Sequence, residues 1–238
     1  MIRYSLFVQP FVYLVLVLSV FHSAGFERTV SQAALTAALV AAWGTVVFTT
    51  VGEIGRERAM GTLAAIALTP SGLWGTFLRK AVGSTLLSGG PVVVWLVFAI
   101  ISKGLGAMST GLLIISVVLF ILGLLALGLL FAALFVIFDR SRFVMNYLEL
   151  PIFFLSGFFF PISVLGPHLS AVSGALPTSW PVSVMREVVF GQPAQVAPAI
   201  GLFIGALLSS SALVIAWAAL RFAEVSARRS ASLEEQIA

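Results

Sequence analysis

The sequence has little charge and no cysteine. Only 9% of its 238 residues are charged, whereas 60% are hydrophobic, and the mean hydropathy is +1.13. A water-soluble domain of this length needs a charged surface to stay dispersed, so the shortage of charge predicts that most of the exterior faces lipid. The absence of cysteine excludes disulfides, thiolate metal sites, iron–sulfur clusters and cysteine nucleophiles.

Motifs of catalytic chemistry are missing as well. The chain has neither a GxxxxGKS/T phosphate-binding loop nor a GxSxG nucleophile elbow, and His22 and His168 lack the companions of a metal-binding helix. The basic residues form no long run with interleaved aromatic residues, which argues against nucleic-acid binding despite an isoelectric point near 10.1. We therefore expect this chain to bind no metal ion, cofactor or nucleic acid, and to hydrolyse no ATP itself.

Long apolar runs dominate what is present. Six of them are long enough to cross about 30 Å of hydrocarbon as helices. They predict an all-α integral membrane protein with one transmembrane domain over residues 1–238. The predicted spans are about 4–24, 30–51, 81–101, 109–138, 143–160 and 196–221. The first run is longer than a usual signal-peptide core and has no small-residue cleavage site after it, so we interpret it as a retained span.

Basic residues divide unequally between the two sides of these spans. If the N-terminus is cytoplasmic, ten lysines and arginines lie on that side and three on the other. Cytoplasmic loops of membrane proteins carry the excess of basic residues. The sequence therefore predicts a multi-pass protein of a bacterial or archaeal cell membrane with both termini in the cytoplasm.

A charged stretch separates the second and third spans. Glu53, Arg56 and Glu57 lie on one face of a helix predicted over about 53–68, and that face continues through Met60 and Leu63. The face changes from charged to apolar, so the second half is expected to rest on the bundle while the first meets water or a polar partner. The mixed signs favour docking into a charged cleft over a merely solvated loop.

The fifth span contains the ionisable residue Glu149, with Asn146 one helical turn before it and Pro151 close by. An ionisable group at this depth is a functional candidate, and Asn146 and Glu149 together are candidates for the translocation path. Two other interpretations stay open: Glu149 pairs with a neighbouring helix, or it lies near the headgroups. Asp139 lies in a short inner loop and most simply pairs with its arginine neighbours.

Prolines interrupt the chain after the fifth span. Gly157 and Pro161 begin this interruption, Pro177 lies within it, and no apolar piece up to the last span is long enough to cross. We predict a re-entrant outer helical element over about 161–193 that lines a vestibule or caps a cavity, because irregular backbone at membrane depth needs such cover. Arg186 is expected to hold its short helices to the sixth span.

The charged stretch also carries a resemblance. Glu57-Arg-Ala-Met-Gly-Thr-Leu63, followed by Thr69-Pro70 and Lys80, is similar to the pattern E-x-E-x-G-T-L-E … T/S-P … K of the membrane subunits of ABC-2 type ATP-binding-cassette transporters. The sequence departs from this pattern at Gly55 and Ala64, where the family has acidic residues. Contacts of those two acidic residues cannot be carried over to this chain.

A second stretch resembles the same family in its outer region before the last span. It consists of Leu155-Ser-Gly-Phe-Phe-Phe-Pro-Ile162 with Leu176-Pro177 and Met185-Arg186. The two patterns occur in the family's order, and the resemblance covers nearly the whole chain.

The resemblance implies a permease with two membrane subunits, identical or related, and two copies of a separate ABC ATPase that bind ATP and Mg²⁺. It implies that the helix at 53–68 is a coupling helix seated in a cleft of the ATPase. The residues expected to make this contact are Glu53, Arg56, Glu57, Arg58, Gly61, Thr62 and Leu63. Family members mostly export drugs, lipids, glycans or peptides, so we expect an apolar or amphipathic substrate.

Two other function classes stay open from the residues alone. One is a secondary carrier coupled to protons through Glu149. The other is an intramembrane lipid-modifying enzyme that uses Glu149 and Asp139 as acid and base. The sequence offers such an enzyme no nucleophile, no metal site and no second nearby carboxylate. A transport subunit without catalytic residues is therefore the favoured hypothesis.

Overall fold

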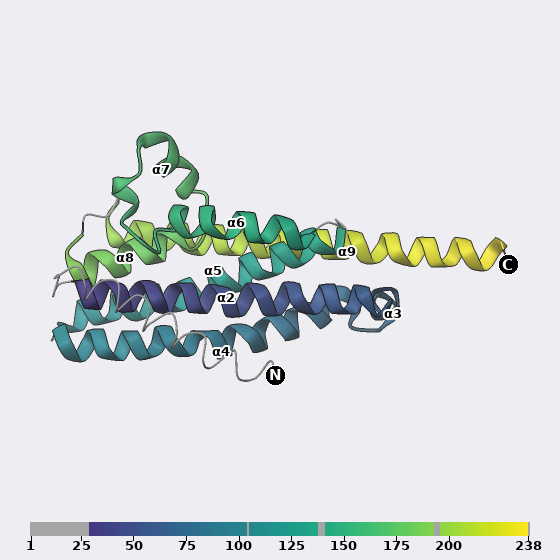
Figure 1. The fold of residues 1–238 in the computed structure, drawn as a ribbon, viewed down its shortest axis with the longest axis horizontal. Helices are drawn as coiled ribbons and strands as arrows, with labels where there is room; N and C mark the ends of the chain where they lie inside the picture. Colours follow the sequence, from purple (N-terminus) through teal and green to yellow (C-terminus); the bar gives the residue numbers. More distant parts are fainter. Residues whose placement is uncertain (1–28, 104, 138–140, 193–195, 238) are drawn as a thin grey trace.

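The computed structural model describes residues 29–103, 105–137, 141–192 and 196–237, and this part of the chain is helical without any strand (Figure 1). The helices follow one another along the chain as α2 (Thr29–Ala59), α3 (Leu63–Leu68), α4 (Gly72–Lys103), α5 (Ala107–Ile137), α6 (Ser141–Leu155), η1 (Ile162–Val164), α7 (Pro167–Ser173), α8 (Ser179–Phe190) and α9 (Pro198–Ile237).

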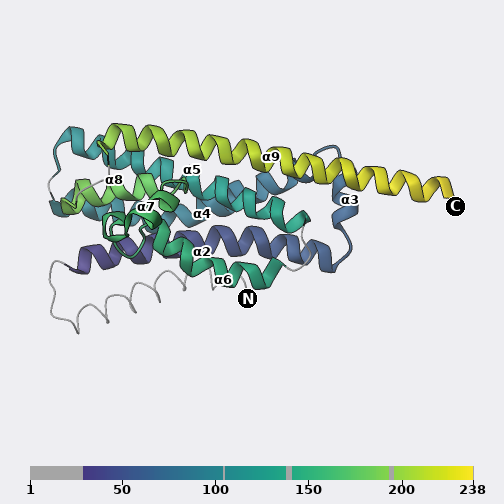
Figure 2. The same cartoon turned by 90° about the horizontal axis from the view of Figure 1, so that it is seen from above.

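Four long helices form the body of the molecule: α2, α4, α5 and α9 run alongside one another (Figures 1 and 2). Each is long and apolar enough to cross a membrane. They correspond to the second, third, fourth and sixth predicted spans and are all longer than predicted. A helix of 31 residues, such as α2, measures about 46 Å and therefore exceeds the hydrocarbon core. The first predicted span, 4–24, lies outside the described residues.

The fifth predicted span, 143–160, is not one helix. α6 has 15 residues and ends at Leu155, so it measures about 22 Å and is too short to cross the hydrocarbon core alone. Gly157, with a φ of 74°, turns the chain in the left-handed region that only glycine adopts easily. The prediction is corrected here, because the apolar run continues through a turn that hydropathy does not detect.

The predicted single helix over 53–68 is also wrong. α2 continues through the charged stretch to Ala59, and a turn then separates it from α3. Gly61 has a φ of 69°, and the amides of Gly61 and Thr62 donate to the carbonyls of Arg58 and Glu57. This is a Schellman motif, which closes the last turn of a helix. The charged face therefore ends at the turn and does not continue into α3.

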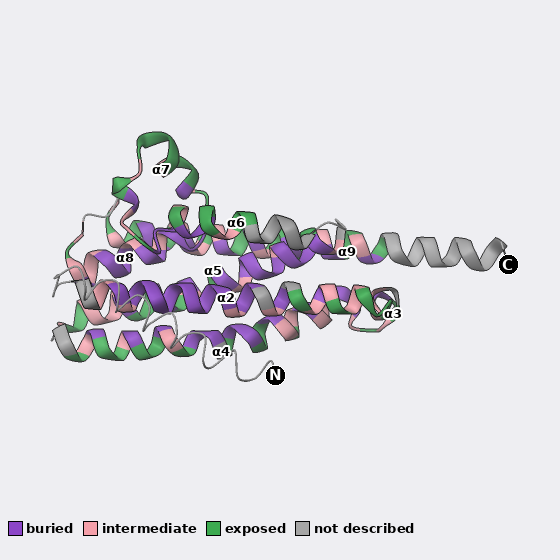
Figure 3. Ribbon diagram, in the orientation of Figure 1, coloured by how far each residue is buried: buried purple, intermediate pink, exposed green. Residues whose placement is uncertain are grey.

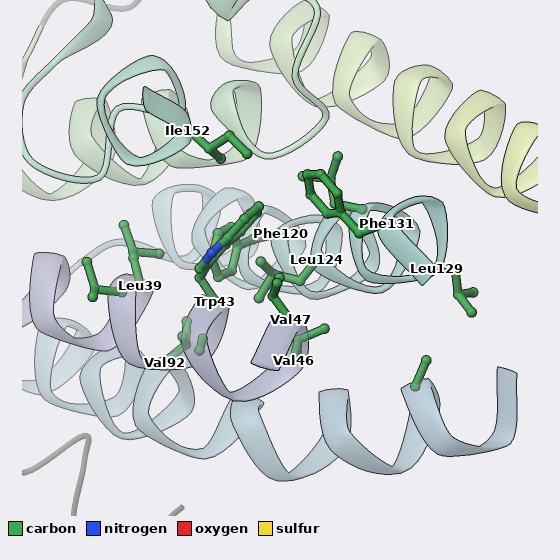
Figure 4. Packing of buried hydrophobic residues seen from close by; sticks show 14 of the residues in the cluster. Leu39, Trp43, Val46, Val47, Val92, Phe120, Leu124, Leu129, Phe131 and Ile152 are labelled. Atoms are coloured by element: carbon green, nitrogen blue, oxygen red, sulfur yellow. The ribbon is translucent and has the colours of Figure 1, made fainter. Parts of the chain in front are cut away.

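Aromatic and aliphatic side chains pack together in the core, and Figure 4 labels Trp43 of α2 and Phe120 and Phe131 of α5 among them. The ring of Trp43 meets those of Phe131 and Phe158 edge to face, with centroids 6.1 Å and 6.4 Å apart, and Phe120 contacts Phe158 at 5.8 Å. Such pairs add to the free energy gained from burial. Figure 3 shows α2 buried along most of its length, whereas α4 and α9 carry many exposed apolar side chains. These exposed faces suit contact with lipid.

The segment after α6 consists of short helices, as the sequence predicts for 161–193. α7 stands away from the bundle, and α8 packs against α5 and α9 (Figure 1). Pro177 approaches Gly123 so closely that a Cβ on Gly123 would lie 3.4 Å from the Pro177 carbonyl carbon. Gly123 is about 24 Å along α5 from Ala107. The turn before α8 therefore reaches about the middle of α5.

Candidate functional site

A charged cluster lies where α2 approaches the first turns of α4, and it consists of Glu53, Arg56, Glu57 and Lys80. The Lys80 ammonium lies 2.8 Å from a carboxylate oxygen of Glu57 and 3.0 Å from one of Glu53. Arg56 forms an ion pair with Glu53 one turn away on α2. One lysine of α4 therefore holds both carboxylates of the α2 face, 23 and 27 residues earlier in the chain.

Arg58 connects α2 to a third helix. Its guanidinium donates to the Val136 carbonyl, at 2.8 Å, in the last turn of α5. The final carbonyls of a helix have no partner within the helix, and a cation is favourable there because of the helix dipole. Three of the four predicted charges, Glu53, Glu57 and Arg58, thus contact other helices of this chain. Arg56 alone among them is largely exposed, at 47% of its side chain.

Thr62 fixes the turn after the cluster. Its hydroxyl donates to the Glu57 carboxylate at 2.5 Å and approaches the Glu57 carbonyl at 3.1 Å. α2 is longer than the hydrocarbon core is thick, so its charged end lies outside the core. Hydrogen bonds from Lys80 and then from Thr62 stabilise the charged carboxylate and hold the pKa of Glu57 below its ordinary value.

The surface beyond the cluster is the α2–α3 turn and the open side of α3. Met60 and Leu68 are 58% and 61% exposed, and Gly61 is exposed between them. Leu63 is partly buried and packs against the core. The structure therefore brings all seven predicted coupling residues to one end of the bundle, but it directs most of the charge inward and leaves apolar side chains exposed at the tip.

A buried carboxylate near this end was not singled out from the sequence. Glu224 of α9 is only 3% exposed, and its Oε2 accepts a hydrogen bond from the Leu73 amide at 3.3 Å. Arg221 lies 3.6 Å from its other oxygen. One signal was available: Glu224 is a single carboxylate at the end of the last apolar run, three residues after an arginine.

A second polar contact lies in the segment after α6, residues 156–192. The sequence predicts that this segment lies on the outer side of the membrane, and we call it the outer segment. Arg186 of α8 is 2% exposed, and its guanidinium donates to the carbonyls of Gly157 at 2.9 Å and Phe158 at 2.8 Å. The Thr36 hydroxyl of α2 donates to the same Phe158 carbonyl at 2.8 Å. The expectation that Arg186 holds the outer helices to the sixth span is corrected: it holds α8 to the turn that follows α6. The turn leaves carbonyls without donors from a helix, and Arg186 donates hydrogen bonds to them.

The two predicted prolines of the outer segment have local roles. Pro161 is the residue before η1, and Pro177 is buried against α5. The Ser156 and Thr178 hydroxyls are 2.9 Å apart, which ties the turn after α6 to the start of α8. Among the described residues, Glu187 has one carboxylate oxygen that is buried without a hydrogen-bond partner. We have no structural account of it.

Of the two candidates for the translocation path, the structure describes the side chain of Glu149 only. Glu149 is partly buried on α6, and the described residues offer its side chain neither a hydrogen bond nor an ion pair. The side chain of Asn146 and the whole of Asp139 lie outside the described part of the chain. Over the same described ranges, no three histidine, aspartate or glutamate side chains lie close enough together to hold a metal ion.

Comparison with known proteins identifies the family of the chain. The profile of a family described as ABC-2 type transporter matches residues 1–190, so the match begins before α2 and ends at the last residue of α8. A search of curated proteins gave no match. The matched range is well over half of the 238 residues. The chain therefore belongs to the ABC-2 type transporter family and is a multi-pass membrane permease of an ABC transporter.

Proposed function

We propose that this permease is driven by ATP hydrolysis on a separate ABC ATPase and exports an apolar or amphipathic substrate from the cytoplasm. The working complex contains two permease subunits, identical or related, and two ATPase subunits that bind ATP and Mg²⁺. The α3 end of the bundle faces the cytoplasm, which the excess of basic residues on that side supports. Export and the class of substrate rest on the family resemblance and on the apolar composition.

The observation that carries the proposal is the construction of the α2–α3 turn. The tip is exposed and apolar at Met60 and Leu68, with Arg56 exposed beside it. Behind the tip, Lys80 ties α2 to α4, and Arg58 ties it to α5. A partner that pushes on this turn would therefore move three long helices together instead of bending a loop.

The contacts within the permease lead us to revise which residues we expect to touch the ATPase. Glu57 and Arg58 are engaged within the permease, so their contribution is to stiffen the turn. We place the contact itself on the exposed side of the turn: Arg56, Met60, Gly61 and Leu68. An apolar tip with a basic residue beside it suits a cleft that is apolar inside and acidic at its rim.

Co-expression with a candidate ABC ATPase, sought first among the genes beside this one, tests the proposal. The wild-type permease is expected to copurify with that ATPase in detergent and to change its rate of ATP hydrolysis. Met60→Glu and Leu68→Glu place a charge in the apolar contact and should each weaken the complex about tenfold or more, because truncated or charged anchor residues dominate such losses.

Met108→Glu is the matched control. Met108 is 83% exposed at the start of α5, at the opposite end of the bundle, where a carboxylate suits the first turn of a helix. This variant should bind the ATPase as the wild type does. A wild-type permease that binds no ATPase, or Met60→Glu and Leu68→Glu variants that bind it with unchanged affinity, would contradict the proposed contact.

A further inference from the structure

The contact between Glu224 and the first turn of α4 joins two parts of the chain that are 151 residues apart. Glu224 lies on α9, which continues beyond the end of α3 in Figure 1. Its side chain is 3% exposed and meets the backbone at Gly72 and Leu73, where the α3–α4 turn becomes α4. A carboxylate buried this deeply needs partners that compensate for lost hydration.

Arg221 on the same helix lies 3.6 Å from one carboxylate oxygen, and the start of α4 is a partner of the other. The Leu73 amide belongs to the first turn of a helix, whose amides have no acceptor within the helix. A carboxylate there satisfies one such amide and interacts favourably with the positive end of the helix dipole. Glu224 therefore acts on α4 as a capping residue does, except that α9 supplies it.

Gly72 is fitted to the same contact. Its φ is 59°, and a Cβ at this position would lie 2.2 Å from Oε2 of Glu224, far inside contact distance. Only glycine combines the backbone conformation with the space that the carboxylate occupies. Two independent features, the left-handed backbone and the close approach, thus describe one interface between α4 and α9.

The contact lies next to α3. α3 packs against both α4 and α9, and the turn between α3 and α4 is closed by the Gly72 amide, which donates to the Thr69 carbonyl at 3.0 Å. Figure 2 shows α3 beside α9 at this end of the bundle. If α3 moves, the first residues to be displaced with it are therefore those that Glu224 contacts.

We propose that Glu224 is a positioning residue that makes α9 move together with α3 and the first turn of α4 when the ATPase acts on the permease. The inference rests on the proposed ATP-driven function and extends it to α9, which lies beyond the range that matches the family. Lys80 and Arg58 link the turn to α4 and α5, and Glu224 supplies the link to the last long helix.

Distance measurements on the whole complex test this. The chain has no cysteine, so single cysteines introduced at the exposed residues Ala65 of α3 and Phe222 of α9, neither of which is in the proposed ATPase contact, can carry spin labels. In the wild-type complex with its ATPase, the distance between the labels is expected to be equal without nucleotide and with a non-hydrolysable ATP analogue and Mg²⁺. In Glu224→Ala the two states should differ by about 2 Å or more, the size of helix shifts at interfaces.

Gly72→Ala is a second variant that acts from the other side, because its Cβ displaces the carboxylate. It should give the same nucleotide-dependent difference. Gly83→Ala is its matched control on the same helix, since a Cβ there meets nothing within 4 Å, and Ser210→Ala is the control on α9. Wild-type distances in both states for Glu224→Ala and Gly72→Ala would overturn the inference.

Amide exchange in the permease alone provides a measurement that needs no ATPase. The peptide that contains Leu73 should exchange about tenfold faster in Glu224→Ala than in the wild type, because its first-turn amide loses its acceptor. Unchanged exchange would overturn the inference even if the ATPase proved to be the correct partner. A wild-type permease that binds no ATPase would instead refute the proposed function.

Discussion

The charged cluster of Glu53, Glu57 and Lys80 at the α3 end and Arg186 in the outer segment are held in different ways. At the α3 end, Glu53 and Glu57 share Lys80, and the three side chains keep 22%, 16% and 32% of their surface exposed. In the outer segment Arg186 is 2% exposed, and among the described residues it donates to backbone carbonyls and the Gln192 side chain but to no carboxylate. The first is an ionic contact near water, and the second replaces helical hydrogen bonds in the interior.

The difference follows from what each place lacks. At the α3 end a Schellman turn closes the last turn of α2, and Glu53 and Glu57 pair with Lys80. In the outer segment the turn at Gly157 leaves carbonyls buried among aromatic rings, where an unsatisfied acceptor costs free energy. An arginine with several fixed donors can supply two carbonyls at once. Four changes would sharpen or break this comparison.

The largest effect is expected for Arg186→Gln. It removes two charge-assisted hydrogen bonds to buried carbonyls, and the free energy of unfolding should fall by about 3 kcal/mol. Thermal unfolding in detergent, measured at low and high salt, should show the same loss at both. Arg79→Gln is the control, because Arg79 is exposed and bonds only within its own helix among the contacts described. An equally stable Arg186→Gln would show that the carbonyls find other donors.

A smaller loss is expected for Lys80→Gln. The two carboxylates keep part of their hydration, so we expect a loss of about 1 kcal/mol at low salt. Salt screens partly exposed charges, and the loss should shrink at high ionic strength. The same unfolding measurement at two salt concentrations checks this. A loss independent of salt would mean that Lys80 is held as Arg186 is, and the contrast between the two ends would disappear.

Gly61→Ala should cost about 1 kcal/mol, because alanine must adopt the left-handed conformation at the end of α2. Gly83→Ala provides the comparison: it lies within α4 with no atom near its Cβ, and it should be neutral or slightly stabilising. The difference between the two alanine variants in thermal unfolding isolates the turn. Equal stabilities would show that the α2–α3 turn tolerates another conformation.

The smallest expected effect is a change in stability at acidic pH. Because the pKa of Glu57 is lowered in the folded protein, its pairing with Lys80 and Thr62 stabilises the fold above the ordinary pKa of a glutamate. That contribution is lost as the pH falls below the ordinary pKa of a glutamate and through the lowered pKa of Glu57. Unfolding curves of the wild type and Glu57→Gln should therefore approach each other in acid. Curves that stay parallel over this range would contradict the pairing.

Much of the fold could be predicted from local patterns, and the prediction failed at identifiable residues. The apolar runs at 30–51, 81–101, 109–138 and 196–221 predict helices that the structure contains, because hydropathy over about 20 residues reflects the thickness of the membrane. Hydropathy failed at Gly157, and helical periodicity failed at Gly61; at each position a single glycine ends a helix within a pattern that looks continuous.

The candidate site was predicted in place but not in its contacts. The charged stretch after the second span was recognised from its unusual density of charge, yet its charges were expected to face a partner. In the structure they contact Lys80 and Val136 of this chain. Which helix lies beside α2 depends on packing of the whole bundle, and no pattern within residues 53–68 contains that information.

By itself the sequence determined that this protein is helical and lies in a membrane, where its long helices fall and where its charges gather. Those properties depend on composition and on spacing over one helix, so they are local. Only the tertiary structure decided that Lys80 pairs with Glu53 and Glu57, that Arg186 donates to the carbonyls after α6, and that Glu224 contacts α4 across 151 residues. These contacts depend on which helices become neighbours.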